Sequence, residues 1–407
     1  FINITSRTYK VMRTFKMATI WKTKVLGHLQ GEEPNFTELT ARHGYSSREY
    51  KVITDDGYIL TSFRIMKARK CKGQIRSPPV LLMHGLLQSS DSWIDSGPDA
   101  GLAYLISDAC YDLWLANVRG TYYSRDHVRL DPDKDPAYWN FDVEQIGIYD
   151  VPAMIDFVLH STRSKKLNYI GFSQGAIVYF VMNSERPDYR DKVQLFIGLA
   201  PASRLYSTKS LVFRAVTQSL EKLEKPLSKL KILEIFSKGS VLQRFLEFFC
   251  QIDRNRICET FLAITDYVDS LHLGSISNKT IKVLFGHAPA GTSLRNIARY
   301  GQSVRSSRFQ KYDYGREKNL ALYGSEQPPE YNLSAVTAPV VCIYGRNDGL
   351  VDTEDISWLV SKLPNVLDAV EVKNPQWTHL DVTYSQYTKR DVFPEIDKYL
   401  FKFTYTM

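Results

Sequence analysis

The sequence predicts an α/β protein with a mostly parallel sheet and helices on both of its faces. Short, almost continuously apolar runs alternate with helical segments between residues 79 and 199. The same alternation resumes near residue 338, after a long stretch of different texture. A pentapeptide with two glycines, residues 171–175, joins one apolar run directly to a helical segment. These observations predict a single sheet domain that is interrupted by an insertion.

The first half of the sheet begins with an expected hairpin. Residues 50–54 and 58–65 are rich in β-favouring side chains and flank the turn Asp55-Asp56-Gly57. A buried strand follows at 79–83 and ends at His84-Gly85. The later elements expected in this half are helix 103–110, strand 111–117, helix 147–160, strand 167–170, helix 176–182 and strand 193–199.

Residues 203–305 are expected to form a helical cap inserted in the sheet domain. Leu211, Phe213, Val216 and Leu220 recur at helical spacing, and further apolar residues from Leu230, Leu233 and Phe236 onward continue the pattern. Ordinary helices packed on one another explain the spacing equally well. A cap over the functional edge of the sheet, with some apolar faces turned toward a lipid, is compatible with that explanation.

The sheet domain therefore comprises residues 35–202 and 306–407. Its second part is expected to contain strand 339–344, helix 353–363, strand 368–372 and a last helix at about 391–402. Residues 1–34 form a basic leader that we expect to be poorly ordered, since residues 1–31 contain six Lys/Arg and no Asp or Glu. A transit peptide explains this bias as well as a disordered leader does.

Composition narrows the functional classes. The 407 residues are 44% hydrophobic and 24% charged, as in an ordinary globular protein, and the net charge is +8. No long Lys/Arg cluster occurs, so we interpret the charge as a solvated basic surface and expect no nucleic-acid partner. No apolar window of 18 residues predicts a transmembrane helix. No motif indicates a cofactor, and no paired C-x-x-C with His indicates a metal.

The cysteines and the asparagine sequons bear on the cellular compartment. Cys110 and Cys342 lie in apolar surroundings and are interpreted as small core residues. Cys250 and Cys258 are close in sequence and able to bridge a local loop. Four N-x-S/T sequons, which favour the secretory pathway weakly, occur at Asn3, Asn35, Asn278 and Asn332.

The pentapeptide Gly171-Phe172-Ser173-Gln174-Gly175 matches G-x-S-x-G, the nucleophile elbow of α/β-hydrolases. A strand that turns sharply into a helix raises its middle residue above the sheet edge. The new helix offers free N–H groups and its positive dipole end to a developing oxyanion. A chance pentapeptide between a strand and a helix is the alternative, so the rest of the chain has to supply a base and an acid.

A serine hydroxyl needs an adjacent base, and the base needs an orienting carboxylate. In α/β-hydrolases these follow in the order Ser, Asp or Glu, His. Here Ser173 is followed by Asp348, just past a strand, and by His379, past the next strand. Asp352 and Asp355 are rival acids, but their positions suit a helix start. The sequence therefore predicts an α/β-hydrolase fold with the triad Ser173, Asp348 and His379.

The oxyanion donors are expected from two backbone amides. One is the N–H of Gln174, directly after the nucleophile, and the other is that of Leu86 after the His84-Gly85 turn. His84 itself is expected to shape this turn. In the predicted mechanism His379 takes the proton of Ser173 as it attacks an ester carbonyl, and Asp348 holds the imidazole tautomer. Water activated by the same histidine then hydrolyses the acyl-enzyme.

From about Asn35 to the C-terminus the chain resembles the acid lipases of animals, which include gastric and lysosomal lipases and their insect relatives. The motifs that carry the resemblance are Asp55-Asp56-Gly57-Tyr58-Ile59-Leu60, His84-Gly85-Leu86-Leu87, Asn117-Val118-Arg119-Gly120, Ser124-Arg125, Tyr149-Asp150-Val151-Pro152-Ala153, the elbow, Pro289-Ala290-Gly291-Thr292-Ser293, Tyr331-Asn332-Leu333, Asn347-Asp348 and His379-Leu380-Asp381. The leader has no clear counterpart, and residues 205–285 match only loosely.

The resemblance implies hydrolysis of triacylglycerols or cholesteryl esters, a lid over the site, glycosylation, and secretion or a lysosomal address. It also supports a Cys250–Cys258 bridge and the oxyanion roles of Leu86 and Gln174. Two alternatives stay open. One is a carboxylesterase or steryl esterase with smaller substrates, and the other is a non-catalytic lipid-binding protein of the yolk type. The presence of both nucleophile and base favours the enzyme.

Overall fold

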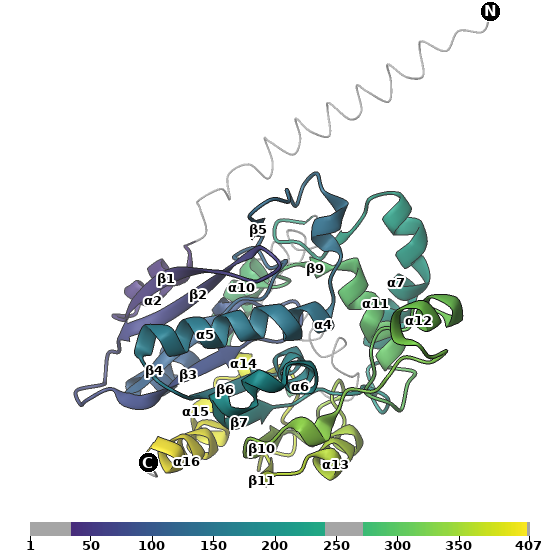
Figure 1. Cartoon of the computed structure of the whole chain (residues 1–407). Coiled ribbons are helices and arrows are strands. Elements are labelled where there is room, and N and C mark those ends of the chain that lie inside the picture. The colour runs from purple at the N-terminus through teal and green to yellow at the C-terminus, as the bar shows by residue number, and fades with distance from the viewer. Residues whose placement is uncertain (1–33, 241–271, 405–407) are drawn as a thin grey trace, which may run out of the picture.

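The computed structural model describes residues 34–240 and 272–404, and a nine-stranded sheet lies at the centre of this part of the chain (Figure 1). The strand order is β1-β2-β4-β3-β6-β7-β10-β11, with β5 beside β2. All neighbours from β4 to β11 are parallel, and β1, β2, β4 and β5 meet through antiparallel pairs. The strands are β1 (Ser46–Ile53), β2 (Tyr58–Lys67), β3 (Arg76–Met83), β4 (Tyr111–Ala116), β5 (Asp126–His127), β6 (Leu167–Phe172), β7 (Val193–Leu199), β10 (Val340–Tyr344) and β11 (Val366–Glu371).

Helices cover both faces of this sheet, as the apolar strands predicted. Alternate residues of one strand point to opposite faces, so Leu81 of β3 belongs to one core cluster and Leu82 to the other. The first cluster packs under α5 (Val151–Thr162), α6 (Gln174–Glu185) and α13 (Thr353–Lys362). The second packs under α2 (Phe36–Arg42), α3 (Leu102–Asp108) and α16 (Phe393–Thr404). The expected α/β-hydrolase architecture is confirmed.

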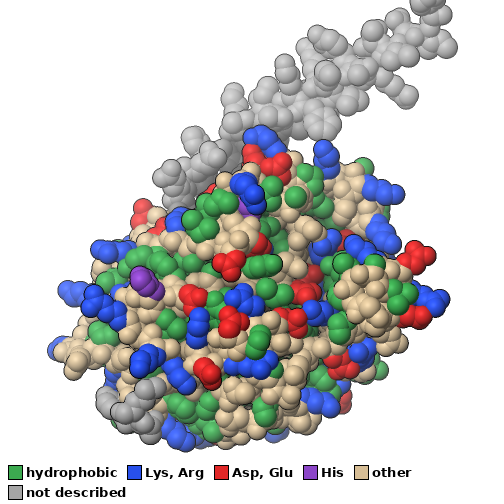
Figure 2. Space-filling model, in the orientation of Figure 1, with side chains coloured by type: hydrophobic (Ala, Val, Ile, Leu, Met, Phe, Trp, Pro, Cys, Tyr) green, Lys and Arg blue, Asp and Glu red, His purple; other side chains and the backbone are tan. Residues whose placement is uncertain are grey.

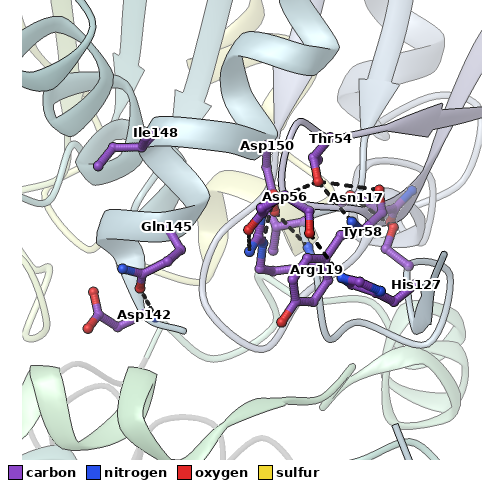
Figure 3. Close-up of polar contacts among 12 residues, drawn as sticks. Thr54, Asp56, Tyr58, Asn117, Arg119, His127, Asp142, Gln145, Ile148 and Asp150 are labelled. Carbon is purple, nitrogen blue, oxygen red and sulfur yellow. Dashed lines mark hydrogen bonds and ion pairs between the residues drawn. The ribbon is translucent and has the colours of Figure 1, made fainter. Parts of the chain in front are cut away.

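The helix expected at 147–160 begins earlier and is irregular. A capping box between Asp142 and Gln145 starts α4 (Val143–Gln145), and a π-helical turn, Ile146–Asp150, links it to α5 (Figure 3). Pro152 has no N–H to donate to the preceding turn. A wide turn just before the proline is the local adjustment that this missing hydrogen bond allows.

The stretch expected to form the cap contains α7 (Leu211–Lys229), α10 (Asn278–His287) and α11 (Leu294–Ser303), and α12 (Arg316–Tyr323) follows it. Helices α7, α11 and α12 lie together at one side of the molecule (Figure 1). The expectation that helical spacing continues through 230–236 is wrong. Leu230 caps α7, Lys231 adopts a left-handed φ of 58°, and β8 (Glu234–Ile235) pairs with β9 (Thr292–Ser293). A short sheet therefore competes successfully with the helical pattern.

The interpretation of Cys110 as a simple core residue is also wrong, because Cys110 forms a disulfide with Cys71. The two cysteines precede β4 and β3 respectively, and these strands are parallel neighbours. Their starts therefore lie side by side, which sequence spacing alone does not reveal. Cys342 is a buried free thiol in β10, as expected. Cys250 and Cys258 lie outside the described residues.

The surface carries both signs of charge. On the face shown in Figure 2, Lys and Arg side chains are interspersed with Asp, Glu and hydrophobic groups rather than gathered in one area. Within residues 34–240 and 272–404, no helix combines the length and apolar character that crossing a membrane requires.

Candidate active site

The strand–turn–helix predicted around Ser173 is present between β6 and α6. Ser173 has φ 51° and ψ −112°, a backbone conformation that a non-glycine residue adopts only when its surroundings impose it. Its amide donates to the carbonyl of Leu199 at the end of β7, at 3.0 Å, which ties the elbow to the neighbouring strand. The side chain is partly exposed at this sheet edge. Strain of this kind is typical of a nucleophile elbow.

The two glycines of the elbow are required by close backbone contacts. A Cβ on Gly175 would lie 2.3 Å from the carbonyl oxygen of Met83, at the end of β3. A Cβ on Gly171 would lie 2.6 Å from the carbonyl oxygen of Gly175. Any larger residue would push α6 away from β3, and with it the serine from the loop that follows β3.

Asp348 and His379 lie together, as the sequence predicted. The Nδ1 of His379 donates to Oδ2 of Asp348 at 2.7 Å, and both side chains are almost fully buried. Oδ1 of Asp348 accepts the amides of Leu350 and Val351, at 2.9 and 2.7 Å. These bonds hold the carboxylate in one orientation, so the proton of His379 stays on Nδ1 and Nε2 is left as the basic nitrogen.

Two packing contacts bring the three loops of the site together. Gly345, just after β10, has no Cβ, and a Cβ there would lie 2.2 Å from the carbonyl oxygen of Trp377, so the acid and base loops touch through their backbones. The ring of Phe172, next to the serine, lies 4.8 Å from the His379 ring between centroids. The same Phe172 ring lies against Gly85 of the oxyanion turn. Phe172, which belongs to the elbow, therefore packs against both the base loop and the oxyanion turn.

The rival acids have structural partners. Asp352 is the N-cap of α13, accepting the amide of Glu354 at 2.9 Å, and it pairs with Lys209. Asp355 accepts from Arg204 at 2.8 Å and from the amide of Ser207 at 2.9 Å. Asp352 therefore caps the start of α13, as its position in the sequence indicated, and Asp355 attaches residues 204–207 to its first turn.

The two predicted oxyanion donors are available. Gln174 is the first residue of α6, so its amide belongs to the unpaired N–H groups of the helix start. Among the described residues, the amides of Gln174 and Leu86 both lack a backbone hydrogen-bond acceptor. The Gln174 side chain is buried and turned away, because its Oε1 accepts from Asn296 and Tyr300, each at 2.9 Å. Only its backbone is left to face the site.

His84 shapes the oxyanion turn, as expected. Its Nδ1 donates to the carbonyl of Gly85 at 2.8 Å, and its Nε2 accepts the amide of Val118 at 3.3 Å. Burial lowers the pKa of His84 to about 4, which outweighs the opposing hydrogen bond to Gly85. The ring is therefore neutral and its tautomer is set by the two backbone groups.

Sequence reasoning did not identify Gln88, which joins the oxyanion turn to the base loop. Its Oε1 accepts the amide of Gly85 at 3.1 Å, and its Nε2 donates to Thr383 and Tyr384, both at 3.2 Å. These two residues belong to α14 (Asp381–Tyr384), which begins two residues after His379. No local sequence signal marks Gln88, because its partners in α14 lie almost 300 positions away.

Three motifs of the resemblance had no assigned role, and Arg119 of one motif contacts Asp56 and Asp150 of the other two. Figure 3 shows its guanidinium between Asp56, in the turn before β2, and Asp150, before α5. It donates to Asp56 at 2.6 and 2.8 Å and to Asp150 at 2.7 Å, and it lies 3.8 Å from the centre of the Tyr58 ring. Arg119 is 1% exposed. Burial alone would lower its pKa, but the two carboxylates raise it above the ordinary value.

Three of the four predicted glycosylation positions are on the surface. Asn35, Asn278 and Asn332 are exposed, and Asn3 lies outside the described residues. Asn35 and Asn332 each cap a helix with their side chains, at α2 and at the turn Leu333–Ala335. Within the described ranges, no three His, Cys, Asp or Glu side chains are arranged to hold a metal.

Comparison with known proteins identifies the family and the fold. Residues 36–97 match a model described as a partial α/β-hydrolase lipase region, and residues 78–225 match the α/β hydrolase fold. The chain is 38% identical over 352 residues to Lipase 1 of Drosophila melanogaster, covering 86% of this chain and 75% of that protein. It is 35% identical over 368 residues to gastric triacylglycerol lipase of Homo sapiens, covering 89% of each.

Solved structures resemble the fold at low identity. A soluble variant of monoglyceride lipase from Saccharomyces cerevisiae superposes with a TM-score of 0.51 at 13% identity, covering 88% of this chain and 99% of that chain. An epoxide hydrolase from Vigna radiata gives a TM-score of 0.50 at 13% identity, covering 88% and 97%. At such identities the likeness concerns the fold alone.

Proposed function

Since the chain belongs to the animal acid lipase family of the α/β-hydrolases and is a carboxylic ester hydrolase, we propose that it hydrolyses neutral lipid esters through Ser173, His379 and Asp348. The observation that carries this proposal is the buried His379–Asp348 pair, whose ring packs against the residue that precedes Ser173. A serine in a strained elbow beside an oriented imidazole is the arrangement that acyl transfer needs.

Each group has one role in the proposed reaction. Nε2 of His379 takes the proton from Ser173 as Oγ attacks the ester carbonyl carbon, and the carbonyl oxygen becomes an oxyanion. The amides of Leu86 and Gln174 stabilise that charge, and each such donor is typically worth about 10²- to 10³-fold in rate. The imidazolium then protonates the leaving alcohol, and water activated by the same nitrogen releases the acid and regenerates Ser173.

The proposed substrates are triacylglycerols or cholesteryl esters presented at a lipid–water interface. The name of the relative gastric triacylglycerol lipase specifies one of these substrates, and the match covers 89% of this chain and of that protein. Secretion or a lysosomal address is proposed on the same relatives and on exposed sequons at Asn35, Asn278 and Asn332. The cap assigned to residues 203–305 remains a proposal in the same sense.

A test of the proposal compares the protein with Ser173→Ala on p-nitrophenyl butyrate, p-nitrophenyl palmitate and emulsified triolein. We expect the variant to lose on the order of 10⁴- to 10⁶-fold in kcat, because only the oxyanion donors and binding remain. The matched control is Ser357→Ala, which alters an exposed serine on α13. Equal activity of Ser173→Ala and the parent protein would overturn the triad.

The same assay separates the alternatives. Hydrolysis of triolein supports a lipase, whereas activity confined to butyrate esters indicates a carboxylesterase for smaller substrates. Binding of triolein without hydrolysis of any ester indicates a non-catalytic lipid-binding protein.

A further inference from the structure

A second buried histidine–aspartate pair lies behind the oxyanion turn. His287 is the last residue of α10, and its Nδ1 donates to Oδ1 of Asp95 at 2.7 Å. Their side chains are only 6% and 1% exposed. Asp95 follows the 3-10 helix η1 (Ser90–Trp93), and its amide donates to the carbonyl of Asp91 at 3.0 Å. The pair therefore joins α10 to the segment that continues from the oxyanion turn.

Burial and charge oppose each other in this pair, because burial raises the pKa of Asp95 while His287 lowers it. Burial would lower the pKa of His287, but the carboxylates of Asp95 and Asp91 outweigh burial and raise it to about 9. Oδ2 of Asp95 is buried and has no hydrogen-bond partner among the described residues. Desolvation offsets much of the attraction in such a buried pair, so we attribute to it a role in holding α10 against the 91–95 segment.

The segment after His287 contacts the oxyanion turn directly. The amide of Ala290 donates to the carbonyl of Leu87 at 2.8 Å, and the carbonyl of Ala290 accepts the amide of Tyr122 at 3.1 Å. Leu87 has φ 60°, so its backbone conformation needs outside support. Leu86, whose amide is a proposed oxyanion donor, directly precedes Leu87.

Asp91 and the neighbouring tyrosines complete the support. The hydroxyls of Tyr122 and Tyr123 both donate to the Asp91 carboxylate. The loop after β4 is thereby attached to the same short segment, 91–95, that carries the partner of His287. A displacement of His287 would therefore be transmitted to Leu87 through Ala290 on one side and through the 91–95 segment on the other.

We propose that His287 and Asp95 are positioning residues for the oxyanion site, holding Leu87 so that the amide of Leu86 faces the substrate carbonyl. Neither residue contacts the reacting atoms, and both act through Ala290 and the 91–95 segment. The inference rests on the proposed function, because it assigns a purpose to the oxyanion donor of that reaction.

The test uses His287→Ala and the milder variants His287→Gln and Asp95→Asn in the full chain. The soluble ester p-nitrophenyl butyrate gives kcat and KM. The rate of covalent reaction with diethyl p-nitrophenyl phosphate reports how well the oxyanion donors stabilise negative charge on the phosphoryl oxygen. The matched control is Val158→Ala, a buried change in α5 away from the oxyanion turn, which lowers stability by making a cavity. All proteins are measured well below their melting temperatures, at equal folded fraction.

For His287→Ala we expect kcat to fall about 10- to 100-fold with KM within about twofold, because an oxyanion donor is misplaced rather than removed. The rate of reaction with the phosphate ester should fall in parallel. Asp95→Asn keeps an acceptor for His287 and should lose less, and His287→Gln should recover part of the activity. Val158→Ala should keep the parent values.

The inference is overturned if the His287 and Asp95 variants, at equal folded fraction, match Val158→Ala in kcat and in the rate with the phosphate ester. It is also overturned if their loss lies wholly in KM. Should His287→Ala fail to fold, His287→Gln and Asp95→Asn carry the same comparison. Failure of the proposed function looks different, since the parent protein would then lack esterase activity or keep it in Ser173→Ala.

Discussion

The pairs His379–Asp348 and His287–Asp95 have the same internal geometry and different surroundings. In each, Nδ1 of a buried histidine donates to a carboxylate oxygen at 2.7 Å. Asp348 uses its other oxygen to accept two backbone amides, whereas the other oxygen of Asp95 has no partner among the described residues. The Asp348 carboxylate is thus oriented by backbone amides as well as by its histidine, whereas the Asp95 side chain is oriented chiefly by its histidine.

Their neighbours differ as well. The ring of His379 packs against the residue before Ser173, at the end of β6. His287 instead precedes a segment that hydrogen-bonds to Leu87, one residue beyond a proposed oxyanion donor. A histidine–aspartate pair therefore does not identify a general base by itself. The group that the second ring nitrogen can reach decides between a catalytic and a positioning role.

Among changes to the carboxylates, the largest effect is expected for Asp348→Asn, set against Asp352→Asn. Loss of the Asp348 carboxylate leaves His379 in the wrong tautomer, and kcat should fall on the order of 10³- to 10⁴-fold. Asp352 is close in sequence but caps α13, and Asn is an equally good N-cap, so that variant should keep kcat within about twofold. Similar losses in both variants would show that the acid has been misassigned. Steady-state kinetics on p-nitrophenyl butyrate decides between these outcomes.

Removal of the Cys71–Cys110 disulfide separates global stability from the geometry of the two pairs. The bridge closes a loop of 39 residues and should contribute about 4 kcal/mol to the free energy of unfolding. It lies at the starts of β3 and β4, opposite the edge that carries the site. Cys71→Ser with Cys110→Ser should lower the urea midpoint and leave kcat unchanged at equal folded fraction. A fall in kcat would mean that the site responds to distant loosening.

A smaller effect on the free energy of unfolding is expected when the pH is raised, and we expect His287 to cause it. Its folded-state pKa of about 9 lies above the ordinary 6.5, because Asp95 and Asp91 outweigh burial and the nearby Lys238. Its stabilising contribution is therefore complete below about pH 6.5 and is lost as pH rises through about 9.

The measurement is the free energy of unfolding by urea between pH 6 and pH 10, for the parent protein and His287→Gln. The parent curve should fall over this range, and the variant should show a shallower decline. Parallel curves would exclude His287 as the source of the alkaline loss of stability.

Much of the sheet domain was predictable because its signals are local. The strand expected at 193–199 coincides with β7, and the strand expected at 111–117 differs from β4 by one residue. The elbow glycines and the chain order of Ser173, Asp348 and His379 also mark the site in the sequence. These positions follow from strand ends, and strand ends follow from apolar runs and turn residues.

The remainder depends on contacts between distant segments. The Cys71–Cys110 bridge, the Gln88 contacts to α14 and the His287–Asp95 pair each join residues that only the folded sheet brings together. Helical spacing through Leu233 and Phe236 misled because the chain there pairs with β9, a tertiary effect that overrides local preference. Motifs such as Arg119 were visible, but their purpose became clear only with Asp56 and Asp150 beside them.

All of these roles depend on the proposal that Ser173 is a nucleophile activated by His379 and Asp348. The most direct measurement is peptide mass spectrometry after reaction with diethyl p-nitrophenyl phosphate, which transfers a diethylphosphoryl group to an activated serine and releases p-nitrophenol. We expect one adduct per chain, on the peptide that contains Ser173. Esterase activity should be lost in proportion to labelling, and the reaction should be strongly slowed in His379→Ala. Inactivation with the adduct on another residue, or full esterase activity in a protein fully labelled at Ser173, would contradict it.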